Sequence, residues 1–169
     1  MAGYPIVAAM FDFSPESTAD KGALYDALVE AAWSITAGER DSIANMANVA
    51  ALIWQFVPDL NWAGFYRNVE GVLVLGPFIG KPACIRIAFG QGVCGAAAAS
   101  GKTQLVPDVH AFPGHIACDA ASRSELVVPV MRGGRPIAVI DLDSPLPSRF
   151  DSADADGIGK LAGAIRDTV

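Results

Sequence analysis

Apolar residues in the first 58 positions follow helical spacing, since they recur three and four residues apart in two separate stretches. The first stretch opens at Ser14, which is followed by a proline suited to the first helical position and by an acid. It ends at Gly38, and a second stretch runs from Asp41 to Pro58, which ends the helical pattern. We predict two N-terminal helices that serve core or dimer packing.

From Asn61 onward the pattern changes to that of strands. One strand is predicted over 61–66 and another over 72–75, with the turn between them at 68–71. Further along, two β-rich runs between Ser124 and Ser144 flank a Gly-Gly pair, which is typical of a tight hairpin. We predict that this hairpin is the central antiparallel pair of the sheet.

The C-terminal region predicts one more helix. Asp151 is its cap, Asp154 stands three residues later, and apolar residues then recur on one face. The predicted fold class is therefore α+β, with an antiparallel sheet flanked by N-terminal and C-terminal helices. The chain is expected to be one domain over 1–169, with the N-terminal helices in 1–58 and the sheet and last helix in 59–169.

Three carboxylates interrupt the apolar arms of the predicted hairpin. Glu125 lies near the start of one arm, and Asp141 and Asp143 lie near the end of the other. Folding the hairpin brings all three to one rim, and Asp141 and Asp143 project from the same face because they are two residues apart. Like charges there destabilise the sheet unless a cation meets them. The alternative is that they face water beyond the sheet edge.

A glycine-rich segment precedes a short predicted helix at 93–101. Gly90, Gly92 and Gly95 have the spacing of a dinucleotide-binding motif, but the helix is too short for the crossover that this fold needs. What remains is a tight turn that leads into a helix N-terminus, where backbone N–H groups favour an anion or a thiolate. Cys94 lies in that first turn, although a small buried side chain is an equally ordinary role for it.

The chain has three cysteines, an odd number without a Cys-x-x-Cys pair, which disfavours a static disulfide framework. Cys118 follows His115 in a Pro-Gly loop, a setting in which a thiol near a potential cation becomes reactive. The cysteine spacings fit no compact zinc pattern, so we expect no metal, and His110 and His115 are assigned to exposed turns. Trp62 stands at the start of a strand, where large aromatics more often belong to the core.

Composition limits the classes of function. The net charge is −6 at pH 7, and the isoelectric point is near 4.7. These values leave no basic surface for nucleic acid and favour a small cationic or zwitterionic ligand. The apolar runs are shorter than a membrane span, and 1–13 lacks the basic start of a signal peptide, so a cytoplasmic protein without a membrane partner is expected.

Four further segments of the sequence are LGPFIGKPACIRI, GQGVCG, FPGHIACDAASRSELVVPV and VIDLDSP. Together they resemble the free methionine-(R)-sulfoxide reductase family, whose members are GAF domains. The resemblance extends from Asn61 to about Leu161, and Cys84, Cys94 and Cys118 fall where the family keeps its redox cysteines. It implies reduction of free L-methionine-(R)-sulfoxide to L-methionine by a homodimer, with the oxidised enzyme recycled by thioredoxin.

The chemistry of sulfoxide reduction agrees with this resemblance. A thiolate attacks sulfur, an acid protonates the departing oxygen, and a second thiol resolves the sulfenic acid without a cofactor. Cys118 is expected to be the nucleophile, with Cys84 as first and Cys94 as second choice to resolve it through a disulfide. The residues expected to protonate the oxygen or hold the substrate are Glu125, Asp141 and Asp143, and Trp62 is expected to contact its methyl and sulfur end.

Two other classes of function remain compatible with the sequence. A GAF domain can bind a cyclic nucleotide or another small effector, because fold does not fix function. A redox sensor would use the same cysteines without turnover. Steady-state production of methionine in the presence of a reductant separates an enzyme from both.

Overall fold

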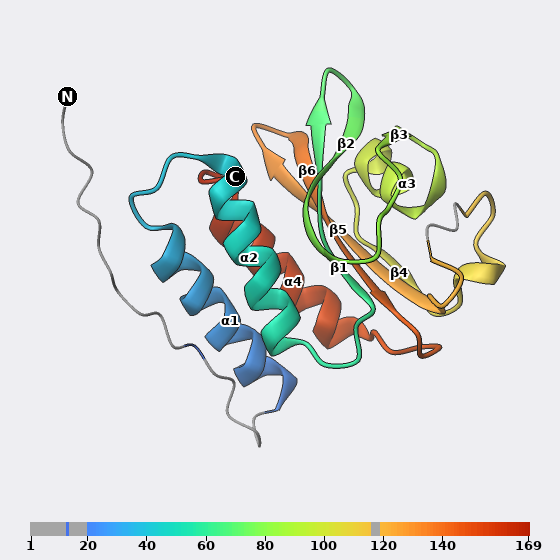
Figure 1. Ribbon diagram of the computed structural model, residues 1–169, viewed down its shortest axis with the longest axis horizontal. Helices are drawn as coiled ribbons and strands as arrows, with labels where there is room; N and C mark the ends of the chain where they lie inside the picture. Colours follow the sequence, from blue (N-terminus) through green and yellow to red (C-terminus); the bar gives the residue numbers. More distant parts are fainter. Residues whose placement is uncertain (1–12, 14–19, 116–118) are drawn as a thin grey trace.

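The computed structural model describes residues 13, 20–115 and 119–169. A six-stranded antiparallel sheet separates a layer of three long helices from a layer of one short helix and loops (Figure 1). The three long helices are α1 (Lys21–Thr36), α2 (Ser42–Phe56) and α4 (Ser152–Ile165). The short helix is α3 (Gly92–Ser100), and a 3-10 turn, η1 (Val109–Ala111), follows it. The predicted α+β class is confirmed.

Caps define where the long helices begin. The predicted start of the first helix at Ser14 lies outside the described residues, and α1 begins at Lys21, where Asp20 accepts a hydrogen bond from Ala23 N at 2.8 Å. Asp41 caps α2 as predicted. Asp151 and Asp154 form the predicted capping box of α4, in which each carboxylate accepts a backbone N–H of the other residue.

The sheet has the strand order β3-β2-β1-β6-β5-β4, and every neighbouring pair is antiparallel. The strands are β1 (Trp62–Val69), β2 (Val72–Gly80), β3 (Arg86–Ala88), β4 (Gln104–Val106), β5 (Ser124–Arg132) and β6 (Arg135–Ser144). The central hairpin of β5 and β6 is confirmed, and the positive φ angles of Gly133 and Gly134, 58° and 76°, are those of its tight turn.

The second strand is longer than the sequence predicted. We expected it to end at Leu75, but β2 continues to Gly80. Its side chains are mostly half-buried on both faces, so apolar and polar positions do not alternate. The register with β1 also shifts between Gly64 and Tyr66. An irregular strand of this kind lacks the period on which a prediction from sequence depends.

Alternation along the central strands creates two cores. Phe65, Leu126, Ile140 and Leu142 face the long helices and join their apolar stripes. The opposite face carries Trp62, Tyr66, Val127 and Val139 and packs on α3 and the loops. Among the described helices, none has both the length and the apolar character needed to cross a membrane. The functional question therefore concerns the face that α3 covers.

Candidate active site

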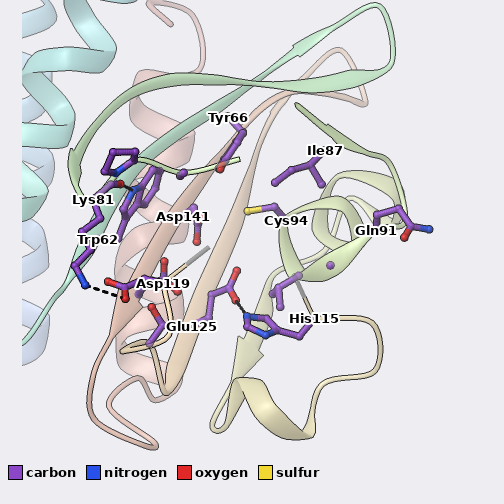
Figure 2. Close-up of a pocket in the computed structure, with 16 residues that line it drawn as sticks. Trp62, Tyr66, Lys81, Ile87, Gln91, Cys94, His115, Asp119, Glu125 and Asp141 are labelled. Atoms are coloured by element: carbon purple, nitrogen blue, oxygen red, sulfur yellow. Dashed lines mark hydrogen bonds and ion pairs between the residues drawn. The ribbon is translucent and has the colours of Figure 1, made fainter. Parts of the chain in front are cut away.

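A pocket opens between the sheet and α3 (Figure 2). The sheet contributes aromatic and acidic side chains, α3 contributes its first turn, and two loops close the sides. The residues that line the pocket include Trp62, Tyr66, Lys81, Cys94, His115, Asp119, Ser122, Glu125, Asp141 and Asp143. Acidic, aromatic and thiol side chains on the face of the sheet that α3 covers therefore lie together in this pocket.

Strand register brings the three carboxylates together. Glu125 of β5 is the direct partner of Asp143 of β6, and Asp143 is in turn the partner of Trp62 on β1. Asp141 lies one pleat further along β6 on the same face. Glu125 and Asp141 are each only 6% exposed, so the alternative that these two face water is wrong.

Burial changes the acid strength of this cluster. Desolvation, reinforced by the charges of Asp141 and Asp143, raises the pKa of Glu125 well above its usual range. Desolvation raises the pKa of Asp141 less, to about 6, because hydrogen bonds from the Cys94 thiol and the Glu125 carboxyl stabilise its ionised form. Burial therefore favours the protonated form of Glu125, whereas the hydrogen bonds that Asp141 accepts favour its ionised form.

Asp143 belongs to the same cluster and meets a hydroxyl group. Desolvation and the charge of Asp141 raise the pKa of Asp143, while a hydrogen bond from Ser122 opposes that rise. Ser122 Oγ also accepts a hydrogen bond from Asn61 Nδ2 at 3.0 Å, so its own proton is left for the carboxylate. The hydrogen bond from Ser122 orients the Asp143 carboxyl group in the pocket.

Cys94 projects from the first turn of α3 toward Asp141 (Figure 2). It is 4% exposed, and desolvation followed by the charges of Asp141 and Glu125 raises the pKa of its thiol well above the usual range. The sequence suggested that the helix N-terminus favours a thiolate there. Burial, reinforced by the neighbouring carboxylates, reverses that preference, so Cys94 is held as a neutral thiol that both packs in the core and faces the pocket.

The remaining cysteines lie differently. Cys118 lies outside the described residues. Cys84 follows Ala83, which lines the pocket, and is itself partly buried against the apolar cluster on that face. The structure thus brings Cys94, Trp62 and the three carboxylates together, while Cys84 is adjacent to the pocket wall rather than part of it.

Several pocket residues escaped the sequence prediction, among them His115 and Tyr66. His115 was assigned to an exposed turn, but its ring is half-buried in the pocket, with Nε2 at 3.8 Å from Glu125 Oε2. Burial and the nearby His110 lower its pKa, which favours the neutral ring. Tyr66 is 1% exposed and lies on the face of Trp62. Its position four residues after Trp62 on one strand was the signal that could have found it. For His115 the sequence holds no such signal.

Asp119 connects the two loops that border the pocket. Its carboxylate accepts hydrogen bonds from Lys81 Nζ at 3.1 Å, from Ala121 N at 2.9 Å and from Asn61 Nδ2 at 3.3 Å. The backbone N–H of Ala121, followed by Lys81, keeps the pKa of Asp119 below its usual range. A charged link therefore joins the β2–β3 loop, which contains Cys84, to the residue that follows Cys118 in sequence.

Comparison with known proteins gives consistent matches. Residues 22–169 match the family model of the GAF domain. The chain is 47% identical to the free methionine-R-sulfoxide reductase of Escherichia coli over 132 residues, which cover 78% of this chain and 80% of that protein. It is 41% identical to the enzyme of the same name from Saccharomyces cerevisiae over 157 residues, 88% of this chain and 87% of that one.

A solved structure agrees with these sequence matches. The free methionine-R-sulfoxide reductase of Neisseria meningitidis, in complex with its substrate, superposes with a TM-score of 0.86. The two chains are 44% identical, and the superposition covers 92% of this chain and 94% of that chain. The GAF-like fold expected from the sequence is confirmed by these matches.

Proposed function

We propose that this chain, which belongs to the free methionine-(R)-sulfoxide reductase family of GAF domains, reduces free L-methionine-(R)-sulfoxide to L-methionine. The family is one of oxidoreductases, so an enzyme is the starting premise. The observation that carries the proposal is the cluster of Glu125, Asp141 and Asp143 in the pocket with Trp62, in which Glu125 and Asp141 are buried and Asp143 is half-buried. A pocket with this composition suits a small molecule that bears both an ammonium group and a compact apolar end.

The carboxylates support recognition of a free amino acid. In water an ammonium group is well solvated, so a protein that binds it in a buried site must supply hydrogen-bond acceptors with negative charge. The ionised Asp141 provides such an acceptor, and Asp143, which accepts a hydrogen bond from Ser122, adds a second carboxyl oxygen. Trp62 stacks on Phe78 with the ring centroids 5.2 Å apart and offers a rigid apolar wall to the methyl and sulfur end of the substrate.

The acid needed for oxygen departure is also at hand. Desolvation and the charges of Asp141 and Asp143 raise the pKa of Glu125 well above its usual range, which favours its protonated form. Glu125 can give that proton to the sulfoxide oxygen as the sulfur–oxygen bond breaks. Asp141 and Asp143 then stabilise the substrate in the position from which the oxygen leaves. This assignment of roles is part of the proposal.

The proposed reaction uses two thiols. The Cys118 thiolate attacks the sulfoxide sulfur, the oxygen is protonated, and methionine leaves while Cys118 becomes a sulfenic acid. The Cys84 thiolate then attacks that sulfenic acid, so water departs and a disulfide forms. Thioredoxin reduces the disulfide with two electrons, and no bound cofactor is required. Cys94 is disfavoured as a nucleophile because its thiol retains its proton.

We place the enzyme in the cytoplasm as a homodimer. Thiols persist in that compartment, where reductants such as thioredoxin keep them reduced. Trp33 on α1 is 64% exposed, and Ile43 and Trp54 on α2 are 42% and 39% exposed. Large apolar side chains exposed on adjacent helices support pairing of subunits through that layer.

The test is a coupled assay with thioredoxin, thioredoxin reductase and NADPH. The proposal expects NADPH oxidation with free L-methionine-(R)-sulfoxide and formation of an equal amount of L-methionine. The (S) isomer, measured in parallel, is expected to react poorly. An enzyme that binds the (R) isomer without producing methionine would instead be an effector-binding GAF domain, and the proposed function would be wrong.

A further inference from the structure

We propose that the pocket also binds a borderline-soft divalent cation such as Zn²⁺. The ligands would be Cys94 Sγ and one carboxylate oxygen each of Glu125 and Asp141, and these three atoms lie within 4.8 Å of one another. They come from α3, β5 and β6, so their positions are set by the packing of α3 on the sheet. His115 Nε2 lies 3.8 Å from Glu125 Oε2, so its ring nitrogen is available as a fourth ligand.

The spacing of these atoms suits a tetrahedral ion. Bonds of about 2.0–2.3 Å to zinc separate tetrahedral ligand atoms by about 3.3–3.8 Å. The three donors lie within 4.8 Å of one another at present, so contraction by about 1 Å would complete the geometry. Each side chain has at least one rotatable bond to provide it, and Figure 2 shows the Cys94 sulfur already directed toward Asp141.

An unmet hydrogen-bonding group supports a cation at this point. Asp141 is 6% exposed, and its Oδ1 atom has no hydrogen-bond donor among the residues that the structure describes. Its cross-strand neighbours are Gly64 on β1 and Val127 on β5, and neither carries a polar side chain. The sheet therefore presents a buried carboxylate oxygen that must be satisfied from the pocket.

The donor set selects the class of metal. A thiolate, two carboxylates and a neutral imidazole suit zinc and its analogues, whereas magnesium and calcium prefer oxygen ligands throughout. The ion would displace the protons of the thiol and of any protonated carboxyl group as it binds. The cysteine spacings in the sequence did not reveal this set, because two of its members are acids remote from Cys94 in the chain.

Binding of the ion has a consequence for catalysis. Glu125 and Asp141 are also the groups assigned to the substrate, so the metal and free methionine sulfoxide would exclude each other. This consequence rests on the proposed function, whereas metal binding itself does not. Zinc would thus act as a competitive inhibitor of the reductase.

The experiment uses the full chain, reduced and freed of metal, with Co²⁺ as a spectroscopic probe. A Cys84→Ser/Cys118→Ser double variant leaves Cys94 as the one remaining cysteine. It is expected to bind one equivalent of cobalt with a thiolate-to-metal charge-transfer band, which Zn²⁺ then abolishes by displacement. Further replacement of Cys94 by serine is expected to remove the band.

Carboxylate variants test the oxygen ligands. Asp141→Asn is expected to weaken Zn²⁺ binding at least about 100-fold in calorimetry, since a lost ligand costs no less than a lost outer-shell contact. The matched control is Asp119→Asn, which removes a pocket carboxylate outside the proposed ligand set. It is expected to change the affinity by less than about tenfold. Circular dichroism of each variant checks that it is folded.

The outcomes separate the possibilities. If the Cys94→Ser variant does not fold, Asp141→Asn in the folded protein decides. A charge-transfer band that survives in Cys94→Ser but is absent from the double variant would place the metal on the other thiols and overturn the proposal. A dissociation constant for Zn²⁺ weaker than about 0.1 mM would also overturn the proposal. If zinc binds as expected but the enzyme has no reductase activity, the proposed function fails and the metal site stands.

Discussion

Asp141 shows how one residue acquires chemistry from its position on a strand. An exposed aspartate is ionised at neutral pH, but burial between strands raises the pKa of Asp141 to about 6. Hydrogen bonds from Cys94 and Glu125 favour its ionised form, whereas desolvation and the charges of Asp141 and Asp143 raise the pKa of Glu125 well above its usual range. The proposed roles of Glu125 as proton donor and of Asp141 as acceptor for ammonium rest on these different surroundings.

The cysteines give the residue-scale prediction. Cys118→Ser is expected to abolish methionine formation even in a single turnover, because it removes the proposed nucleophile. Cys84→Ser is expected to release up to one methionine per subunit and then to stop recycling with thioredoxin, because only the resolving step is lost. Single-turnover methionine is measured by chromatography. Stoichiometric methionine from Cys118→Ser would refute the nucleophile, and normal turnover of Cys84→Ser would point to Cys94 as the resolving thiol.

At the scale of elements, α1 and α4 pack closely because a glycine faces an aromatic ring. Gly157 of α4 lies against the ring of Tyr25 on α1, where a Cβ atom would overlap ring carbons. Tyr25 is 1% exposed, and its hydroxyl donates a hydrogen bond to Asp154 at 2.7 Å. The ring therefore cannot move aside without breaking a buried hydrogen bond.

Replacing this glycine tests the close contact. Gly157→Ala is expected to destabilise the protein by about 1–3 kcal/mol through overpacking, despite alanine's better helix propensity. Gly163→Ala is the matched control on the same helix, because among the described residues no non-neighbouring atom lies within 4 Å of its would-be Cβ. It is expected to stabilise by about 0.5–1 kcal/mol. Denaturant unfolding measures both, and equal effects of the same sign would contradict the packing described.

The cap of α4 predicts a response to acid. A hydrogen bond from Lys21, followed by the backbone N–H of Asp154, lowers the pKa of Asp151 from 3.8 to about 2. Because its pKa is lower when folded, Asp151 stabilises the fold above about pH 4, and this contribution is lost as the pH falls toward about 2. Asp151→Asn keeps the capping geometry but removes the charge.

Thermal unfolding of the two proteins checks this sign. The wild-type melting temperature is expected to exceed that of Asp151→Asn at neutral pH, and the difference is expected to shrink between about pH 4 and about pH 2. The other carboxylates titrate in both proteins, so they largely cancel in the difference. A gap that widens as the solution is acidified would contradict the lowered pKa.

For the whole molecule, local signals predicted elements better than the contacts among them. The caps at Asp41 and Asp151 and the Gly-Gly turn gave the helices and the central hairpin, since each signal lies within a few residues. The extension of β2 to Gly80 was missed because its side chains are half-buried on both faces.

The pocket was predictable to the extent that strand alternation defines it. From strand alternation and the hairpin turn, the sequence predicted that Glu125, Asp141 and Asp143 lie close together, and the structure has them in one pocket. His115 was not predictable, because a loop rather than a repeating element carries it to Glu125. For Cys94 the sequence left a thiolate and a small buried side chain equally open. The raised pKa of its thiol results from burial, and from charges on strands remote in sequence that a local pattern does not reveal.

The central claim is that the pocket carboxylates recognise a free amino acid by binding its ammonium group. N-acetylated methionine sulfoxide has no ammonium, so it would leave those carboxylates unpaired, at a cost of about 3–5 kcal/mol, or roughly a hundredfold to a few thousandfold in specificity. Asp141→Asn is expected to reduce the difference in kcat/KM between the two compounds, mainly by lowering kcat/KM for the free amino acid.

The most direct test compares kcat/KM for free and N-acetylated L-methionine-(R)-sulfoxide, on the wild-type enzyme and on Asp141→Asn. The account predicts that the wild type prefers the free amino acid by at least about a hundredfold and that the variant loses most of that preference. Equal efficiency of the wild type on both compounds would contradict it, because the carboxylates would then not recognise the ammonium group.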